Sequence, residues 1–211
     1  MVPEFSVYIF DVDGTLTDSA VDICPSVAQV LEKYQLPPQS YEFLRSYIGL
    51  HLEALFHDLD AGLTKERCDA MIADYRTIYH AREHSQTRVF EGIPEMLNGL
   101  PGRKSTATTK GTPATKIILQ KFGLIHHFEH VQGTDGFPAK PEPDVILKTV
   151  ELFRVRPADC LFIGDAPADM EAGKRAGVKV CAVSYGYGNH DAMRKFQPDY
   201  WINAPIELLP G

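Results

Sequence analysis

Three short runs of strand-forming residues, each followed at once by a polar residue, constrain the fold of this chain most. The runs and the polar residues after them are residues 7–10 before Asp11, 161–164 before Asp165 and, less clearly, 104–107 before Thr108. Runs of this length without polar alternation are typical of strands buried on both faces of a parallel sheet. Two further strands are expected at residues 178–184 and 200–202.

Helical patterns separate these strands from about residue 90 onward. Pro143 opens a segment with apolar residues at helical spacing, and residues 168–176 end at Gly177, a residue type that commonly stops helices. This alternation predicts an α/β fold with a doubly wound parallel sheet.

The alternation stops between residues 17 and 88, where we find no convincing strand. The segments with a helical pattern are residues 21–34, 51–60 and 65–83. We therefore expect an α/β core formed by residues 1–16 and 89–211, with an all-helical domain at residues 17–88 inserted after the first strand.

Composition and charge restrict the partners of the chain. A net charge of −7 implies no basic surface for nucleic acid or an anionic membrane. No apolar stretch approaches a membrane span, and the first residues lack the basic region of a signal peptide. The cysteines, at positions 24, 68, 160 and 181, form no close pair and are expected to be reduced and buried. We expect a cytoplasmic protein, and no obligate protein partner is implied.

The polar residues after the strands are expected to converge. Ligands of open parallel sheets bind beyond the carboxyl ends of the strands, where Asp11, Thr108 and Asp165 would lie. Lys140 precedes Pro141 on a loop that could reach the same edge. Carboxylates, a hydroxyl and an ammonium at one edge suit metal-assisted phosphoryl transfer.

Four segments, taken together and in order, resemble the motifs of the haloacid dehalogenase superfamily in its phosphatase form. They are DVDGTLTDS at 11–19, TTK at 108–110, KPEP at 140–143 and GDAPAD at 164–169. The resemblance covers nearly the whole chain, and the helical insert resembles the helical cap of the family. It implies a Rossmann-like core, Mg²⁺ as cofactor and hydrolysis of a small phosphorylated metabolite through an aspartyl phosphate.

The resemblance assigns Asp11 as nucleophile and Asp13 as general acid and base, with Gly14 turning the backbone between strand and site. An anion at Asp11 would repel a dianionic phosphate by roughly 4 kcal/mol per charge pair at about 4 Å, so nearby cations are required. The implied Mg²⁺ ligands are the Asp11 and Asp165 carboxylates, the Asp13 carbonyl and, through water, Asp169. Lys140 would add positive charge, and the Thr108 hydroxyl would donate to a phosphoryl oxygen.

Two residues depart from the family pattern. Thr109 stands where Asn is usual, and Ala166 stands where Ser or Thr is frequent. Both are expected to tune rate or affinity without abolishing activity. Lys110, beside Thr109, is either a substrate contact or only a charge at the edge of the site.

The cap segment LRSYIGL at 44–50 resembles the phosphoglycolate phosphatase branch, so 2-phosphoglycolate is the favoured substrate. Amides near Gly49 could meet an anionic substrate. Arg45 could pair with its carboxylate or equally be a solvated helix charge. The alternatives are a phosphosugar mutase of the β-phosphoglucomutase type, a pyrophosphatase or a nucleotidase. We interpret Gly186-Tyr187-Gly188 as a turn, because the rest of a dinucleotide-binding pattern is missing.

Overall fold

The computed structural model describes residues 2–209 and contains a central parallel sheet of strand order β4-β1-β5-β6-β7. The strands are β1 (Val7–Phe10), β4 (Arg103–Thr106), β5 (Cys160–Gly164), β6 (Lys179–Val183) and β7 (Tyr200–Ile202). The predicted α/β class is confirmed. Strands β1 and β7 have the predicted bounds, β5 begins one residue earlier than predicted, and β4 and β6 differ by one residue at each end.

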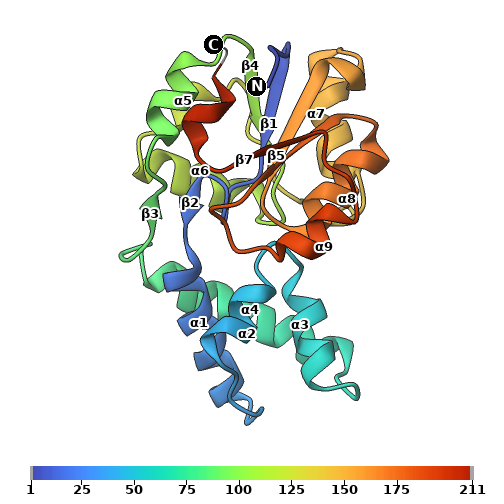
Figure 1. Ribbon diagram of the computed structural model, residues 1–211. Coiled ribbons are helices and arrows are strands. Elements are labelled where there is room, and N and C mark those ends of the chain that lie inside the picture. Colours follow the sequence, from blue (N-terminus) through green and yellow to red (C-terminus); the bar gives the residue numbers. More distant parts are fainter. Residues whose placement is uncertain (1, 210–211) are drawn as a thin grey trace.

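Strand β1 lies between β4 and β5 and is buried on both faces. Tyr8 and Phe10 pack into one apolar cluster, whereas Val7 and Ile9 pack into another on the opposite face. Figure 1 shows helices on both sides of the sheet. On one side lie α5 (Ile93–Gly99) and α6 (Thr112–Lys121); on the other lie α7 (Asp144–Phe153), α8 (Pro167–Ala176) and α9 (His190–Arg194). Two-sided burial explains why β1 is apolar without alternation.

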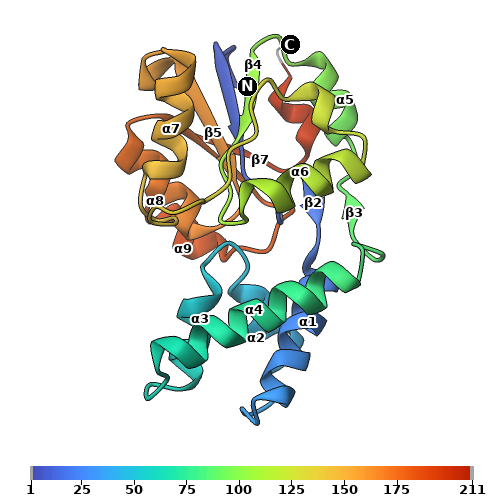
Figure 2. The same ribbon diagram turned by 180° about the vertical axis from the view of Figure 1, so that it is seen from behind.

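The insert forms a separate helical body below the sheet (Figure 2). Its helices are α1 (Ala20–Lys33), α2 (Tyr41–Ser46), α3 (Leu52–Leu59) and α4 (Lys65–Ala81). They enclose their own apolar cluster, which includes Leu31, Phe56 and Met71. The helical cap is thus confirmed. Helix α2 was not predicted, because six residues are too few to show a helical period.

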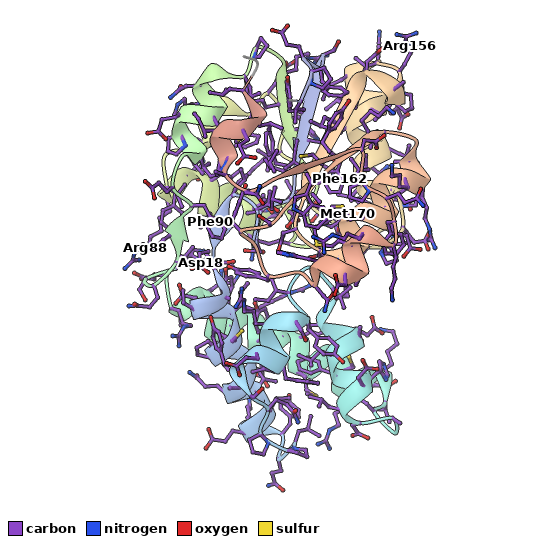
Figure 3. The ribbon with its side chains drawn as sticks, in the orientation of Figure 1. Asp18, Arg88, Phe90, Arg156, Phe162 and Met170 are labelled. Carbon is purple, nitrogen blue, oxygen red and sulfur yellow. The ribbon has the colours of Figure 1, made fainter. Side chains whose placement is uncertain are left out.

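A short antiparallel ribbon joins cap and core. Strand β2 (Thr17–Asp18) pairs with β3 (Arg88–Val89), and Figure 3 shows Asp18 and Arg88 at this junction. The expectation of no strand between residues 17 and 88 is therefore wrong at both ends of that segment. Two-residue strands leave no alternation for sequence analysis to detect. The exact domain boundaries at 16/17 and 88/89 remain a prediction.

Two further expectations concern cysteines and membranes. All the cysteines are free and buried, as expected. Within residues 2–209, no helix combines the length and apolar character needed to cross a bilayer.

Candidate active site

The carboxyl ends of β1, β4 and β5 bring the predicted polar residues to one edge of the sheet. Asp11 follows β1, Thr108 lies just beyond β4 and Asp165 follows β5, and all are buried. The carboxylates of Asp11, Asp165 and Asp169 offer oxygen atoms within 4.8 Å of one another. The convergence expected from the sequence is therefore present in the structure.

Lys140 lies at the centre of this cluster. Its ammonium donates to Asp11 Oδ1 at 2.7 Å, to Asp169 Oδ1 at 2.5 Å and to the Ala107 carbonyl at 3.1 Å. Burial alone would lower the pKa of Lys140, but the carboxylates of Asp11 and Asp169 outweigh burial and raise it. Lys140 is therefore a fixed positive charge beside Asp11.

Asp169 connects this ammonium to the start of α8. While Oδ1 binds Lys140, Oδ2 accepts from the amides of Asp165 at 3.1 Å and Ala166 at 2.9 Å. These amides precede the helix and have no intrahelical partner, so the carboxylate satisfies them. Asp169 thus orients both Lys140 and the backbone that carries Asp165.

Two donors outside this cluster hold the Asp165 carboxylate. Its Oδ1 accepts from the Thr15 hydroxyl at 3.0 Å, and its Oδ2 accepts from the Tyr187 amide at 2.8 Å. Gly14 has φ +94° and packs so closely that a Cβ atom there would overlap the Asp165 carboxylate. The turn at Gly14 therefore serves Asp165 as well as Asp13.

The charge of the cluster favours a divalent cation. Burial, partly offset by Lys140 and reinforced by Asp169, raises the pKa of Asp11 to about 7. Burial, then the charges of Asp169 and Asp11, also raise the pKa of Asp165. When all three carboxylates are ionised, the single ammonium of Lys140, which binds Asp11 and Asp169, leaves two negative charges in excess. Oxygen donors with that excess fit Mg²⁺.

Asp13 is positioned by both core and cap. Its Oδ1 accepts from the Ser19 hydroxyl at 2.6 Å, and its Oδ2 lies 3.2 Å from the Lys110 ammonium. The same ammonium lies 3.3 Å from the Tyr79 hydroxyl of α4 and 4.6 Å from the centre of its ring. Lys110 is therefore buried between core and cap.

A cavity of about 580 Å³ opens beside Asp13, between core and cap. It is lined by the predicted residues Gly49, Thr109 and Lys110, and by cap side chains that are largely apolar. Arg76 and His80 of α4 add charged or polar groups. The cavity therefore reaches the Asp13 side chain from the cap.

Two predicted residues have other contacts. Arg45 does not line the cavity: its Nη2 donates to the Gly186 carbonyl at 3.2 Å, and its guanidinium lies 5.1 Å from the centre of the Tyr187 ring. Arg45 therefore contacts the core, and its role as a substrate contact stays a prediction. The Thr108 hydroxyl accepts from the Lys110 amide at 3.4 Å.

Sequence analysis missed Ser19, Tyr79 and Tyr187. Ser19 ends the first motif, which was a usable signal, and Tyr187 lies within the segment interpreted as a turn. Tyr79 gave no signal, because a tyrosine in an amphipathic helix usually belongs to the core.

Three clustered carboxylates, two of them bound to a buried lysine, lie on a parallel α/β core with a helical cap, and this arrangement fits the class of phosphoryl-transfer hydrolases. The model of the haloacid dehalogenase-like hydrolases matches residues 8–183, and the chain belongs to this family, in its phosphatase group.

Curated relatives are named phosphoglycolate phosphatases. Phosphoglycolate phosphatase 1 of Pseudomonas aeruginosa is 30% identical over 212 residues, covering 96% of this chain and 78% of the relative. Phosphoglycolate phosphatase of Aquifex aeolicus is 31% identical over 207 residues, covering 96% and 94%. The crystal structure of a "predicted phosphatase" from Clostridium acetobutylicum has a TM-score of 0.90 at 28% identity, covering 98% of this chain and 97% of that one.

Proposed function

We propose that the chain is a Mg²⁺-dependent phosphomonoester hydrolase that acts through a phosphorylated Asp11. The observation that carries the proposal is the buried carboxylate of Asp11, which lies 2.7 Å from the Lys140 ammonium and beside two further carboxylates. This arrangement supplies a nucleophile together with a fixed cation and a metal site.

The proposed reaction has two displacements. Asp11 forms a bond to phosphorus while the bond to the ester oxygen breaks, and Asp13 donates a proton to that oxygen. Asp13 then takes a proton from the water that attacks the phosphorylated Asp11, which releases inorganic phosphate. Lys140 and the Thr108 hydroxyl would stabilise charge on the phosphoryl oxygens.

The proposed metal ligands are the carboxylates of Asp11 and Asp165 and the backbone carbonyl of Asp13, with Asp169 reaching the ion through water. When bound there, Mg²⁺ would neutralise excess negative charge and polarise the phosphoryl group. Asp169 accepts three hydrogen bonds, one of them from the Lys140 ammonium, whereas each oxygen of Asp165 accepts one bond from a neutral donor; this supports the indirect role of Asp169.

We propose 2-phosphoglycolate as the substrate, in agreement with the names of the relatives. Its carboxylate would meet Lys110 and the Gly49 amide, since both residues line the cavity; the amides of the two residues that flank Gly49 donate to backbone carbonyls. Thr109 would add a hydroxyl. Arg45 is a weaker candidate for this contact, because its guanidinium binds the core.

The volume of the cavity favours a second candidate, a nucleoside monophosphate. A cavity of about 580 Å³ with largely apolar walls can hold a base and a sugar, whereas 2-phosphoglycolate would leave much of it empty. Closure of the cap on a small substrate would reduce the cavity volume, and the volume would then no longer favour a nucleotide.

A substrate panel with Mg²⁺ tests the proposal. We would compare kcat/KM for 2-phosphoglycolate, nucleoside monophosphates, glucose phosphates and pyrophosphate, with Asp11→Asn as the control for contaminating activity. The highest value for 2-phosphoglycolate would support the first candidate, and a nucleotide preference would support the second. Stimulation by a sugar bisphosphate would instead indicate a mutase.

A further inference from the structure

Ser19 is the N-cap residue of helix α1, yet its side chain does not cap the helix. A serine at this position usually accepts a hydrogen bond from an amide of the first turn. Here the Ser19 hydroxyl makes no capping bond and donates instead to Asp13 Oδ1 at 2.6 Å. A residue well suited to capping therefore serves the site instead.

The hydroxyl of Tyr187, which lies in a loop far along the chain, binds the backbone amides at the start of α1. The Tyr187 hydroxyl accepts from the amides of Ser19 at 2.6 Å and Ala20 at 3.0 Å, and donates to Asp18 Oδ1 at 2.8 Å. Tyr187 follows β6, 168 residues after Ser19. Asp18 lies at the junction of cap and core (Figure 3), so these bonds cross that junction. A residue of the core thus accepts hydrogen bonds from the backbone amides at the start of a cap helix.

We propose that Tyr187 is a positioning residue for Asp13. By binding the amides of Ser19 and Ala20 and the Asp18 carboxylate, it fixes the backbone that carries the Ser19 hydroxyl, which in turn holds the Asp13 carboxylate. Without the phenolic oxygen, these part-buried amides lose their partner, and the backbone at Ser19 relaxes from the position that holds its hydroxyl against Asp13. Asp13 then loses its donor. The catalytic consequence rests on the proposed role of Asp13 as acid and base.

Tyr187→Phe isolates this hydroxyl. The variant keeps the amide that donates to Asp165 Oδ2 and the ring beneath the Arg45 guanidinium, so the contacts of Tyr187 other than those of the hydroxyl are retained. Tyr34→Phe is the matched control. The Tyr34 hydroxyl donates to Asp74 at 2.7 Å near the other end of α1, away from the site.

A kinetic cycle tests the proposal. We would measure kcat/KM for an alkyl phosphate and an aryl phosphate in wild type, Tyr187→Phe, Ser19→Ala and the double variant. Each single variant should lose roughly tenfold more activity on the alkyl ester than on the aryl ester, because alkoxide departure needs the proton of Asp13. The double variant should lose no more than Ser19→Ala alone, and Tyr34→Phe should keep the wild-type ratio. Single losses that multiply in the double variant, or an unchanged ratio in Tyr187→Phe, would overturn the proposal.

Thermal unfolding gives a readout independent of catalysis. Tyr187→Phe should lower Tm more when Ser19 is present than in the Ser19→Ala background, because only then does it also weaken the bond between Ser19 and Asp13. Equal shifts in both backgrounds would overturn the proposal. If Asp13→Asn instead affects both esters equally, the proposed role of Asp13 fails, whereas the coupling of Tyr187 to Ser19 in Tm would still stand.

Discussion

The ammonium of Lys140 lies 2.7 Å from Asp11 Oδ1, and the two side chains are almost fully shielded from solvent. The same ammonium binds Asp169, so its loss would leave buried carboxylates without their cation. The pair therefore ties the nucleophile to the stability of the fold.

Replacing Lys140 with methionine should lower the free energy of unfolding by roughly 3–5 kcal/mol, because buried charges lose their partner. Urea denaturation at pH 7 without divalent ions measures this loss. Lys174→Met is the control, since its ion pair with Asp199 is partly exposed and should contribute less than about 1 kcal/mol. Similar losses in both variants would contradict the prediction.

Asp11→Asn should abolish turnover while the fold is retained, because the amide has the same shape and is a far weaker nucleophile. We expect a fall in kcat of at least roughly a thousandfold, about 4 kcal/mol in barrier height. Steady-state kinetics and circular dichroism measure the two effects. Activity within about tenfold of wild type would be incompatible with a nucleophilic Asp11.

Stability and metal binding should depend on pH together. Without metal, the pKa of Asp11 is raised from 3.8 to about 7. A carboxyl with a higher pKa in the folded than in the unfolded state favours folding while protonated, and this contribution is lost as pH rises through the folded pKa. The metal-free protein should therefore become less stable between about pH 4 and pH 7, and Mg²⁺ should raise Tm more at pH 8 than at pH 5.

Asp165→Asn should remove most of that Mg²⁺ effect. An Mg²⁺-induced Tm shift that is equal at both pH values would argue against binding by these carboxylates. Turnover should be lost with a chelator and restored by Mg²⁺, whereas Ca²⁺ should bind without supporting it, because its larger and looser coordination shell misplaces Asp11.

Asp13→Asn should impair alkyl phosphates much more than aryl phosphates, since a phenolate departs with little protonation. The expected difference is roughly a hundredfold in kcat/KM. Parallel assays of one alkyl and one aryl ester measure it. Equal losses would mean that Asp13 acts only through the metal site.

Arg45→Ala should reduce activity on 2-phosphoglycolate and p-nitrophenyl phosphate by the same factor, because Arg45 contacts Gly186 and Tyr187 of the core and not the cavity. KM measurements on both esters check this. A rise in KM confined to 2-phosphoglycolate would restore Arg45 as a carboxylate ligand.

The sequence predicted those parts of the fold that have a local pattern. Strand β1 is found where its apolar run predicts it, and α8 ends at Gly177, whose φ of +73° suits glycine. The β2–β3 ribbon was missed because pairing of Thr17 with Val89 depends on tertiary structure.

The site likewise has features that the sequence predicted and features that it did not. Convergence of Asp11, Thr108 and Asp165 follows from topology, because each comes after a parallel strand. The contacts of Tyr187 with Asp165 and Ser19 do not, since they join loops far apart in the chain. The contacts of Arg45 with Gly186 and Tyr187 also join segments far apart in the chain, so the sequence could not predict them.

Insertion of the cap between β1 and β4 also affects the order in which the chain can fold during synthesis. Val7 pairs with Cys160, whereas α1 to α4 are contiguous and pack on one another. At a synthesis rate of about 5–20 residues per second, β1 would wait roughly five seconds or more for β4 and longer for β5, with its apolar side chains unpaired until β4 appears. The cap should therefore become protease-resistant on the ribosome before the core, and residues 7–10 should be the segment that chaperones bind in the arrested nascent chain.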